Sequence, residues 1–202
     1  LERIVIRNSV RIRAADPKRG AAIVWHHRTR NNNDDDSSKQ QTKKNTSAIE
    51  IEDSCTFVSL QHLNILHFSR GNDIWNGNCA VFCHGHLTHT VIHGCSIQSD
   101  SGRGVVVANG ASLKLAQSTV HDCAATGLYV GHMDSILDVA DCNIIRNGFG
   151  PPDDENDDSD ALIHSGHSGL YVEAAEAEIR NTLLAENCLT GLSVVRRGTV
   201  HI

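Results

Sequence analysis

The chain has 202 residues and a formal net charge of −6 at pH 7, so it lacks the basic excess that nucleic-acid-binding proteins usually show. Hydrophobic residues make up 40% of the sequence but aromatic residues only 4%, so Val, Ile, Leu, Ala and other small side chains must fill its core. No apolar run approaches the roughly 18 residues of a membrane-spanning helix. The opening LERIVIRNSVRIR also lacks the apolar region of a signal peptide. We therefore expect no nucleic-acid or membrane partner.

The first third of the chain contains two apolar segments separated by a polar one. Residues 1–25 predict an irregular first coil of a repeat, and residues 48–65 predict a second coil with spaced Ile and Leu residues. Between them, residues 26–47 contain RTRNNNDDDSSKQQTKKNT, a low-complexity polar run. Such a run cannot bury enough apolar surface to order itself, so it predicts a disordered loop.

One short phrase then recurs along the rest of the chain. It opens at Cys79, Gly104, Gly127, Gly169 and Gly191, at intervals of 25, 23, 42 and 22 residues. The long interval equals one normal repeat plus an insertion, GFGPPDDENDDSDALIHSGHS, which is acidic and contains proline. This composition predicts a solvated loop over residues 150–168.

Apolar residues within each repeat recur with period two, which is the signal of a β-strand. One column of aligned apolar residues is Ile92, Leu115, Val139 and Ile179. Five residues further along, a second column is Ile97, Val120, Ile144 and Leu184. Each repeat thus supplies two or three short strands, and stacking of successive repeats creates the core that one repeat cannot make alone.

These features predict an all-β fold, a right-handed parallel β-helix of about six coils with two polar insertion loops. Residues 1–202 form a single domain in this interpretation, cut from a longer protein because the chain starts without Met and stops within a repeat. The segment LQHLNIL from Leu60 resembles a leucine-rich repeat. The other coils lack the leucine-rich spacing and carry β-branched residues and Gly instead, which favours the β-helix.

The seven cysteines contain no C-x-x-C pair. This spacing weakens both zinc-binding and thioredoxin-like interpretations. We expect buried thiols in a reducing compartment, and therefore a cytoplasmic or nuclear protein.

The alternation also predicts which side chains point outward from the first strand of each coil. That outward column is Val81, Val106, Tyr129, Tyr171 and Ser193. If the insertion loops out, Tyr129 and Tyr171 stack on adjacent coils. They can form a platform for a sugar ring or an extended peptide, because each ring offers a flat apolar face and a hydroxyl. They can equally form a cross-strand pair that only stabilises the sheet. The candidate ligand-binding residues are Tyr129, Tyr171, Val106 and Ser193.

The outward column of the second strand is Val91, Lys114, Asp138 and Glu178. Two carboxylates on neighbouring strands can act as an acid/base pair or bind calcium. Lys114 and Arg180 stand beside them, however, and this arrangement is typical of a surface salt-bridge ladder. We assign no catalytic residue.

Histidines concentrate in CHGHLTHTVIHG, with His84, His86, His89 and His93, and His132 follows in an equivalent turn. Zinc needs about four ligands arranged as a tetrahedron, but a run that crosses a turn points its rings in different directions. The acidic run 153–160 lacks the Gly and spaced ligands of a calcium loop. We therefore expect no metal and no cofactor.

The coils from GNCAVFCHGHL to GLYVGHMDS resemble the β-helix repeats of F-box proteins and related carbohydrate-binding and sugar-hydrolase (CASH-type, PbH1) repeats. The resemblance covers residues 48–202 and rests on the cadence C-x-I…G-x-x-V. It implies a substrate-recognition surface, which in the F-box relatives belongs to a ubiquitin ligase that binds its scaffold through other regions.

The function expected from these observations is a non-catalytic recognition module that binds a protein or a glycan along an exposed β-helix face. The alternative is a carbohydrate-active enzyme, because polysaccharide lyases, hydrolases and epimerases show the same cadence. Asp138 and Glu178 would be the first acids to test in that case.

Overall fold

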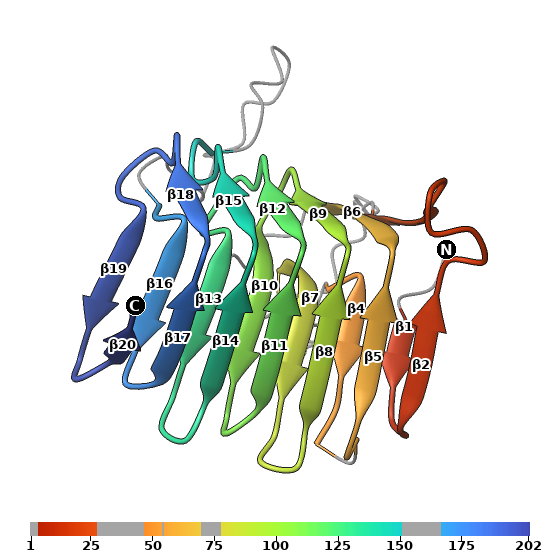
Figure 1. Ribbon diagram of the computed structural model, residues 1–202, viewed down its shortest axis with the longest axis horizontal. Helices are drawn as coiled ribbons and strands as arrows, with labels where there is room; N and C mark the ends of the chain where they lie inside the picture. Colours follow the sequence, from red (N-terminus) through yellow and green to blue (C-terminus); the bar gives the residue numbers. More distant parts are fainter. Residues whose placement is uncertain (1–3, 28–46, 54, 70–77, 151–166) are drawn as a thin grey trace, which may run out of the picture.

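The computed structural model describes residues 4–27, 47–53, 55–69, 78–150 and 167–202. Within these ranges the chain forms three parallel sheets, which wrap around one axis as a β-helix (Figure 1). The first sheet contains β1 (Ile4–Ile6), β4 (Ile49–Ile51), β7 (Cys79–His84), β10 (Arg103–Ala108), β13 (Leu128–Gly131), β16 (Leu170–Glu173) and β19 (Leu192–Val195). The second contains β2 (Val10–Arg13), β5 (Val58–Gln61), β8 (His89–His93), β11 (Ser112–Ala116), β14 (Ile136–Ala140), β17 (Glu176–Arg180) and β20 (Thr199–His201). The third contains β3 (Ala21–His27), β6 (Leu63–Ser69), β9 (Ser96–Ser99), β12 (Thr119–His121), β15 (Asn143–Ile145) and β18 (Leu183–Ala185).

Each turn of the solenoid contributes one strand to every sheet. The described residues make six complete turns, and β19 and β20 add two strands of a seventh. Figure 1 shows the turns stacked along the long axis, with the second sheet in front of the first and the third sheet along the upper edge. The predicted fold class and the predicted number of coils are therefore confirmed.

The core lies between the three sheets and consists of stacked columns of aliphatic side chains. In the second sheet, Leu115 pairs with both Ile92 and Val139, and Val139 pairs with Ile179. In the third sheet, Val120 pairs with Ile97 and with Ile144. Every apolar side chain at these positions is buried, because alternate residues of a strand point to the same face. The first predicted column is confirmed, and so is the second at Ile97, Val120 and Ile144, whereas Leu184 pairs with Ile144 but is only partly buried.

One register was predicted incorrectly, at β7. The sequence alignment placed Cys79 opposite Gly104, but Cys79 pairs with Arg103 and Val81 pairs with Val105. A shift of one residue exchanges the two faces of a strand. Val81 is therefore fully buried, and Phe82 takes its place in the outward column. The segment CAVFC is apolar throughout, so alternation alone could not fix its register.

A single residue in the left-handed conformation turns the chain from the second sheet to the third. It has a φ of 48° at Gln117, 54° at Asp141 and 46° at Asn181. Asn and Asp tolerate this conformation better than most residues, since their short side chains can hydrogen-bond locally. A similar position follows the third-sheet strands, with φ of 49° at Asp122 and 53° at Arg146.

The two predicted insertions fall mostly outside the described residues. β3 extends to His27, and residues 28–46 are not described. The acidic insertion is described only at Gly150 and from His167 onward. Gly150, the first residue of the insertion, is held to the preceding turn by a backbone hydrogen bond of 2.8 Å from Gly150 N to Ala124 O.

All seven cysteines are free thiols, and six of them are buried, whereas Cys188 is half-buried. Burial raises the pKa of Cys83 and of Cys123 to about 12. A thiol with such a pKa is a poor nucleophile at neutral pH, so these residues act as small apolar core side chains. Across the described ranges, no helix is both long and apolar enough to cross a membrane.

Candidate functional site

The outer face of the first sheet carries a column of large side chains. Phe82 pairs with Val106, Val106 with Tyr129, and Tyr129 with Tyr171. These four residues occupy the same position in four successive turns. Their side chains point outward, since the residues before and after each of them are buried in the core. Neighbouring parallel strands lie about 4.8 Å apart, so this register places the rings within reach of one another.

Tyr129 and Tyr171 stack face to face, as the repeated phrase predicts. Their ring centroids are 5.9 Å apart and their planes differ by 11°. The guanidinium of Arg103 lies over the Tyr129 ring, 4.5 Å from its centroid. A cation over an aromatic face is attracted by the ring quadrupole, and this contact gains strength because Arg103 is buried. Tyr129 is thus held between a cation and a second ring.

The hydroxyl of Tyr129 is fixed by Glu173, which is 44 residues away in the sequence but lies on the adjacent strand of the next turn. Tyr129 Oη donates a hydrogen bond of 2.7 Å to Glu173 Oε2. Arg196 Nη1 forms an ion pair of 2.5 Å with the other carboxylate oxygen. Glu173 pairs in register with Gly131, and the missing side chain at Gly131 leaves room for the phenol. The Tyr129 ring is therefore preorganised.

This environment shifts the ionisation of Tyr129. Burial, followed by the hydrogen bond to Glu173 and its negative charge, raises the pKa of Tyr129 to about 12. The phenol is consequently a neutral donor to the carboxylate at physiological pH. Because this pKa lies above the ordinary value of 10.0, the associated stability is fully present below pH 10. It is lost as the pH rises from about 10 to about 12.

The chain contains only two tyrosines, so a Tyr171→Phe variant isolates the titration of Tyr129. We expect its tyrosinate absorbance at 295 nm to rise with a midpoint near 12, because the phenol is buried against Glu173. The same variant in 8 M urea provides the reference, with a midpoint near the ordinary value. Adding Glu173→Gln removes the carboxylate and should lower the folded-state midpoint. A folded-state midpoint that equals the urea value would contradict the anchored geometry.

The rings and their anchors line a groove of about 480 Å³. Its lining also includes polar groups on both sides, namely Asn109, Thr126, His132, His167, Ser168 and Glu173. This combination of apolar rings with a few polar groups is typical of ligand-binding clefts. Among the described residues that line the groove, Glu173 is the only carboxylate.

The four candidate ligand-binding residues occupy different places in this site. Tyr129 and Tyr171 form the groove wall. Val106 also lines the groove, but it is 5% exposed and packs beneath Phe82 and Tyr129. Ser193 pairs with Tyr171 in register but is not part of the groove lining. Val106 therefore supports the rings from below, and Ser193 lies beyond their edge.

Among the groove residues that the sequence did not identify as candidates, Phe82 and Arg103 have identifiable reasons. Phe82 was assigned to the wrong face by the register error at β7. Arg103 lies immediately before the glycine that opens its repeat, and nothing in the alternation indicates that a cation there is buried. A long side chain that reaches across to the next strand is visible only once the register is known.

On the second sheet, Asp138 and Glu178 take part in a surface salt-bridge ladder, as the neighbouring Lys114 and Arg180 indicate. Lys114 Nζ lies 3.6 Å from Asp138 Oδ2, and Arg180 Nη2 lies 2.6 Å from Asp138 Oδ1. Arg180 also forms an ion pair with Glu178. Both carboxylates thus have cationic partners on the outer surface. An acid/base pair needs one carboxyl kept protonated, which these cations oppose.

The histidines do not converge. His84 stacks on Phe82 with centroids 4.6 Å apart and lies 3.3 Å from Glu50 Oε1. His93 contacts His62 edge to face at 5.4 Å. In the described part of the chain, no group of three or more His, Cys, Asp or Glu residues could hold a metal ion.

The fold and the groove define a class of protein: a parallel β-helix solenoid with a tyrosine-lined groove on one outer face. Comparison with known families agrees. The chain matches the family described as right handed beta helix region over residues 23–202. The chain belongs to this family, which includes both enzymes and binding modules. A search of the curated proteins and a search of the solved structures found no match.

Proposed function

We propose that this protein is a recognition module that binds an extended ligand, a glycan or a protein segment, in the groove over Tyr129 and Tyr171. The observation that carries the proposal is the stacked pair itself, with Tyr129 clamped by Arg103 and Glu173. Preorganised rings bind with little loss of conformational freedom, which is why aromatic anchors dominate many binding surfaces. Arg103 and Tyr171 cover the two faces of the Tyr129 ring, so a sugar ring or a planar side chain would lie along the edges and hydroxyls of the two rings or stack on the far face of Tyr171.

The groove favours binding over chemistry. Most glycoside hydrolases use two carboxyl groups flanking the scissile bond. Within the described lining, Glu173 is the sole carboxylate, and Tyr129 and Arg196 already engage both of its oxygens. The carbohydrate-active alternative would have to use Asp138 or Glu178 on the second sheet, where cations neutralise both.

The proposal is tested by arrays of defined oligosaccharides and of peptides, probed with the wild type and with Tyr171→Ala. We expect Tyr171→Ala to weaken the selected ligand by at least about 30-fold, the loss typical of a central aromatic anchor. The double variant Tyr129→Ala/Tyr171→Ala should abolish binding. Asp138→Ala is the matched control, because it removes a surface side chain of the second sheet and should leave binding unchanged.

Two results would contradict the proposal. One is the absence of any array ligand whose binding depends on Tyr171. The other is binding or polysaccharide turnover that depends on Asp138 and not on the tyrosines, which would favour the enzyme.

A narrower form of the proposal makes the module the substrate-recognition part of an F-box-type ubiquitin ligase adaptor. Its support is the sequence resemblance alone. Purification of the protein from its own cells, with mass spectrometry of its partners, tests this form. A ubiquitin-ligase scaffold among those partners would support it, and a purification that recovers only other proteins or glycans would leave the broader proposal to stand alone.

A further inference from the structure

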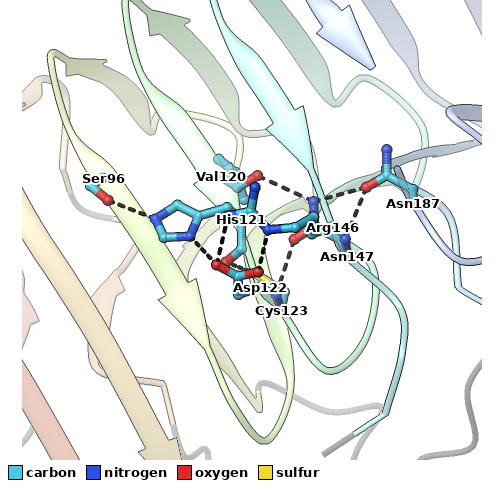
Figure 2. A network of polar contacts seen from close by, with 8 residues as sticks. All are labelled: Ser96, Val120, His121, Asp122, Cys123, Arg146, Asn147 and Asn187. Carbon is cyan, nitrogen blue, oxygen red and sulfur yellow. Dashed lines mark hydrogen bonds and ion pairs between the residues drawn. The ribbon is translucent and has the colours of Figure 1, made fainter. Parts of the chain in front are cut away.

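A second set of polar side chains lies on the outer face of the third sheet, whereas the tyrosine groove lies on the first sheet (Figure 2). Ser96 Oγ lies 2.8 Å from His121 Nε2. His121 Nδ1 lies 2.6 Å from Asp122 Oδ2. The three residues face outward, because Ile97 and Val120 beside them are fully buried.

The hydrogen bonds select one tautomer of the neutral imidazole. A carboxylate only accepts hydrogen bonds, so the neutral ring must carry its proton on Nδ1, which donates to Asp122. Nε2 is then the unprotonated nitrogen and accepts the hydrogen bond from the Ser96 hydroxyl. This order of hydroxyl, imidazole and carboxylate is the arrangement in which a histidine activates a serine.

Arg146 holds the carboxylate in place, as Figure 2 shows. Its Nε donates to Asp122 Oδ1 at 2.8 Å and its Nη2 donates to Oδ2 at 3.0 Å. A forked contact of this kind fixes both oxygens. The Arg146 guanidinium, with a smaller contribution from His121, holds the pKa of Asp122 below its usual range. Asp122 is thus ionised and oriented toward His121.

We propose that Ser96, His121 and Asp122 form a hydrolytic site for small-acyl esters on the outer face of the third sheet. Ser96 Oγ attacks the ester carbonyl carbon and its proton passes to His121 Nε2. The C–O bond to the alcohol then breaks, and the alcohol leaves with that proton. Water attacks the acyl-serine by the same route, which releases the carboxylic acid and restores Ser96. Ester and water are consumed, and acid and alcohol are formed.

The position of the three residues sets the substrate class. They lie partly exposed on a sheet face, so an ester carried on a large molecule can reach Ser96. Such a surface offers a long acyl chain little apolar enclosure, which favours small groups such as acetyl. Thr119 pairs with Ser96 in register, so its hydroxyl is the nearest candidate on the adjacent strand to donate to the carbonyl oxygen as it becomes negative.

The test uses a fluorophosphonate, which labels activated serines, and p-nitrophenyl acetate as a small-acyl ester. We expect peptide mass mapping to locate the phosphonyl group on Ser96. Ser96→Ala should remove the label and the catalysed release of p-nitrophenol. His121→Ala should slow labelling by at least about 100-fold, because a positioned general base contributes that much or more. Ser9→Ala is the matched control, since the Ser9 hydroxyl bonds Thr56 Oγ1 at 2.8 Å and has no imidazole partner among the described residues.

Asp122 is a positioning residue, and Asp122→Asn tests it with a side chain of the same shape that suits the same backbone conformation. Asp122 has a φ of 49°, a conformation that Asn also tolerates well. The amide no longer selects the Nδ1–H tautomer, so kcat should fall by at least about 100-fold while KM stays unchanged. Labelling of Ser96 no faster than that of Ser9, or hydrolysis unaffected by Ser96→Ala, would overturn the proposal. Neither result would contradict the proposed ligand binding in the tyrosine groove, which is tested separately.

Discussion

Replacement of Asn147 by Leu should lower the free energy of unfolding by about 2–6 kcal/mol, because two buried backbone groups lose their partners. Asn147 is fully buried just beyond β15. Its Oδ1 accepts a hydrogen bond of 3.1 Å from Cys123 N, and its Nδ2 donates one of 3.2 Å to Val120 O. Each bond joins one turn of the solenoid to the turn before it.

The same ladder continues into the next turn, as Figure 2 shows. Asn187 Oδ1 accepts from Asn147 N and from Asn147 Nδ2, both at 3.0 Å. Leucine has the same branched set of four side-chain heavy atoms as asparagine, although it is bulkier, and it has no polar atoms, so it leaves these groups unpaired. Unfolding in urea, followed by circular dichroism, measures the loss.

Asn143→Leu is the matched control for this prediction. Asn143 lies in the same turn but is exposed on the outer face of β15, where substitutions usually change stability by less than about 0.5 kcal/mol. Equal losses in the two variants would show that the ladder adds nothing beyond ordinary side-chain packing. A loss below about 1 kcal/mol at Asn147 would also contradict the prediction.

The fold was readable from the sequence because each repeat carries its own copy of the same columns. Val120 has a counterpart in every neighbouring turn, and burial of such a column needs only the right period. Tyr129 and Tyr171 were predictable as a stacked pair for the same reason. Periodicity fails where a strand is apolar on both faces, and this is why β7 was aligned one residue out of register.

The side-chain contacts within the two sites depend on rotamers and on how far each side chain extends toward the next strand. The period of the apolar residues carries no information on either. Arg103 covers a ring on the adjacent strand, and Glu173 meets the hydroxyl of Tyr129. His121 reaches back to Ser96 rather than to Gln98, the residue at its own level in the preceding turn. The period of the apolar residues predicts the strands near these residues, but it places none of them against its partner.

A glycine can be required by a positive φ or by close backbone approach, and the structure distinguishes the two for the column of glycines that opens the repeats. Gly104, Gly127, Gly169 and Gly191 all have φ outside the left-handed region. Close approach is therefore the reason for glycine. A Cβ at Gly104 would lie 2.5 Å from the carbonyl oxygen of Gly127 and 2.6 Å from Val120 Cγ1.

Gly104→Ala should destabilise the protein strongly, with a melting temperature lowered by about 6–12 °C, since relief of the overlap requires a shift of the adjacent turn. The Gly127 oxygen accepts the hydrogen bond of 2.9 Å from Val105 N, so that shift also strains the ladder between β10 and β13. Gly191→Ala occupies the same repeat position, but its nearest contacts would be 3.1 Å and 3.2 Å, both to Leu184. Both variants lose the same chain entropy in the unfolded state, so the difference between them isolates the contact. Calorimetry of the two variants measures this difference. Equal melting temperatures would contradict the prediction, because they would show that the close approach at Gly104 adds nothing to the effect of the substitution on the unfolded chain.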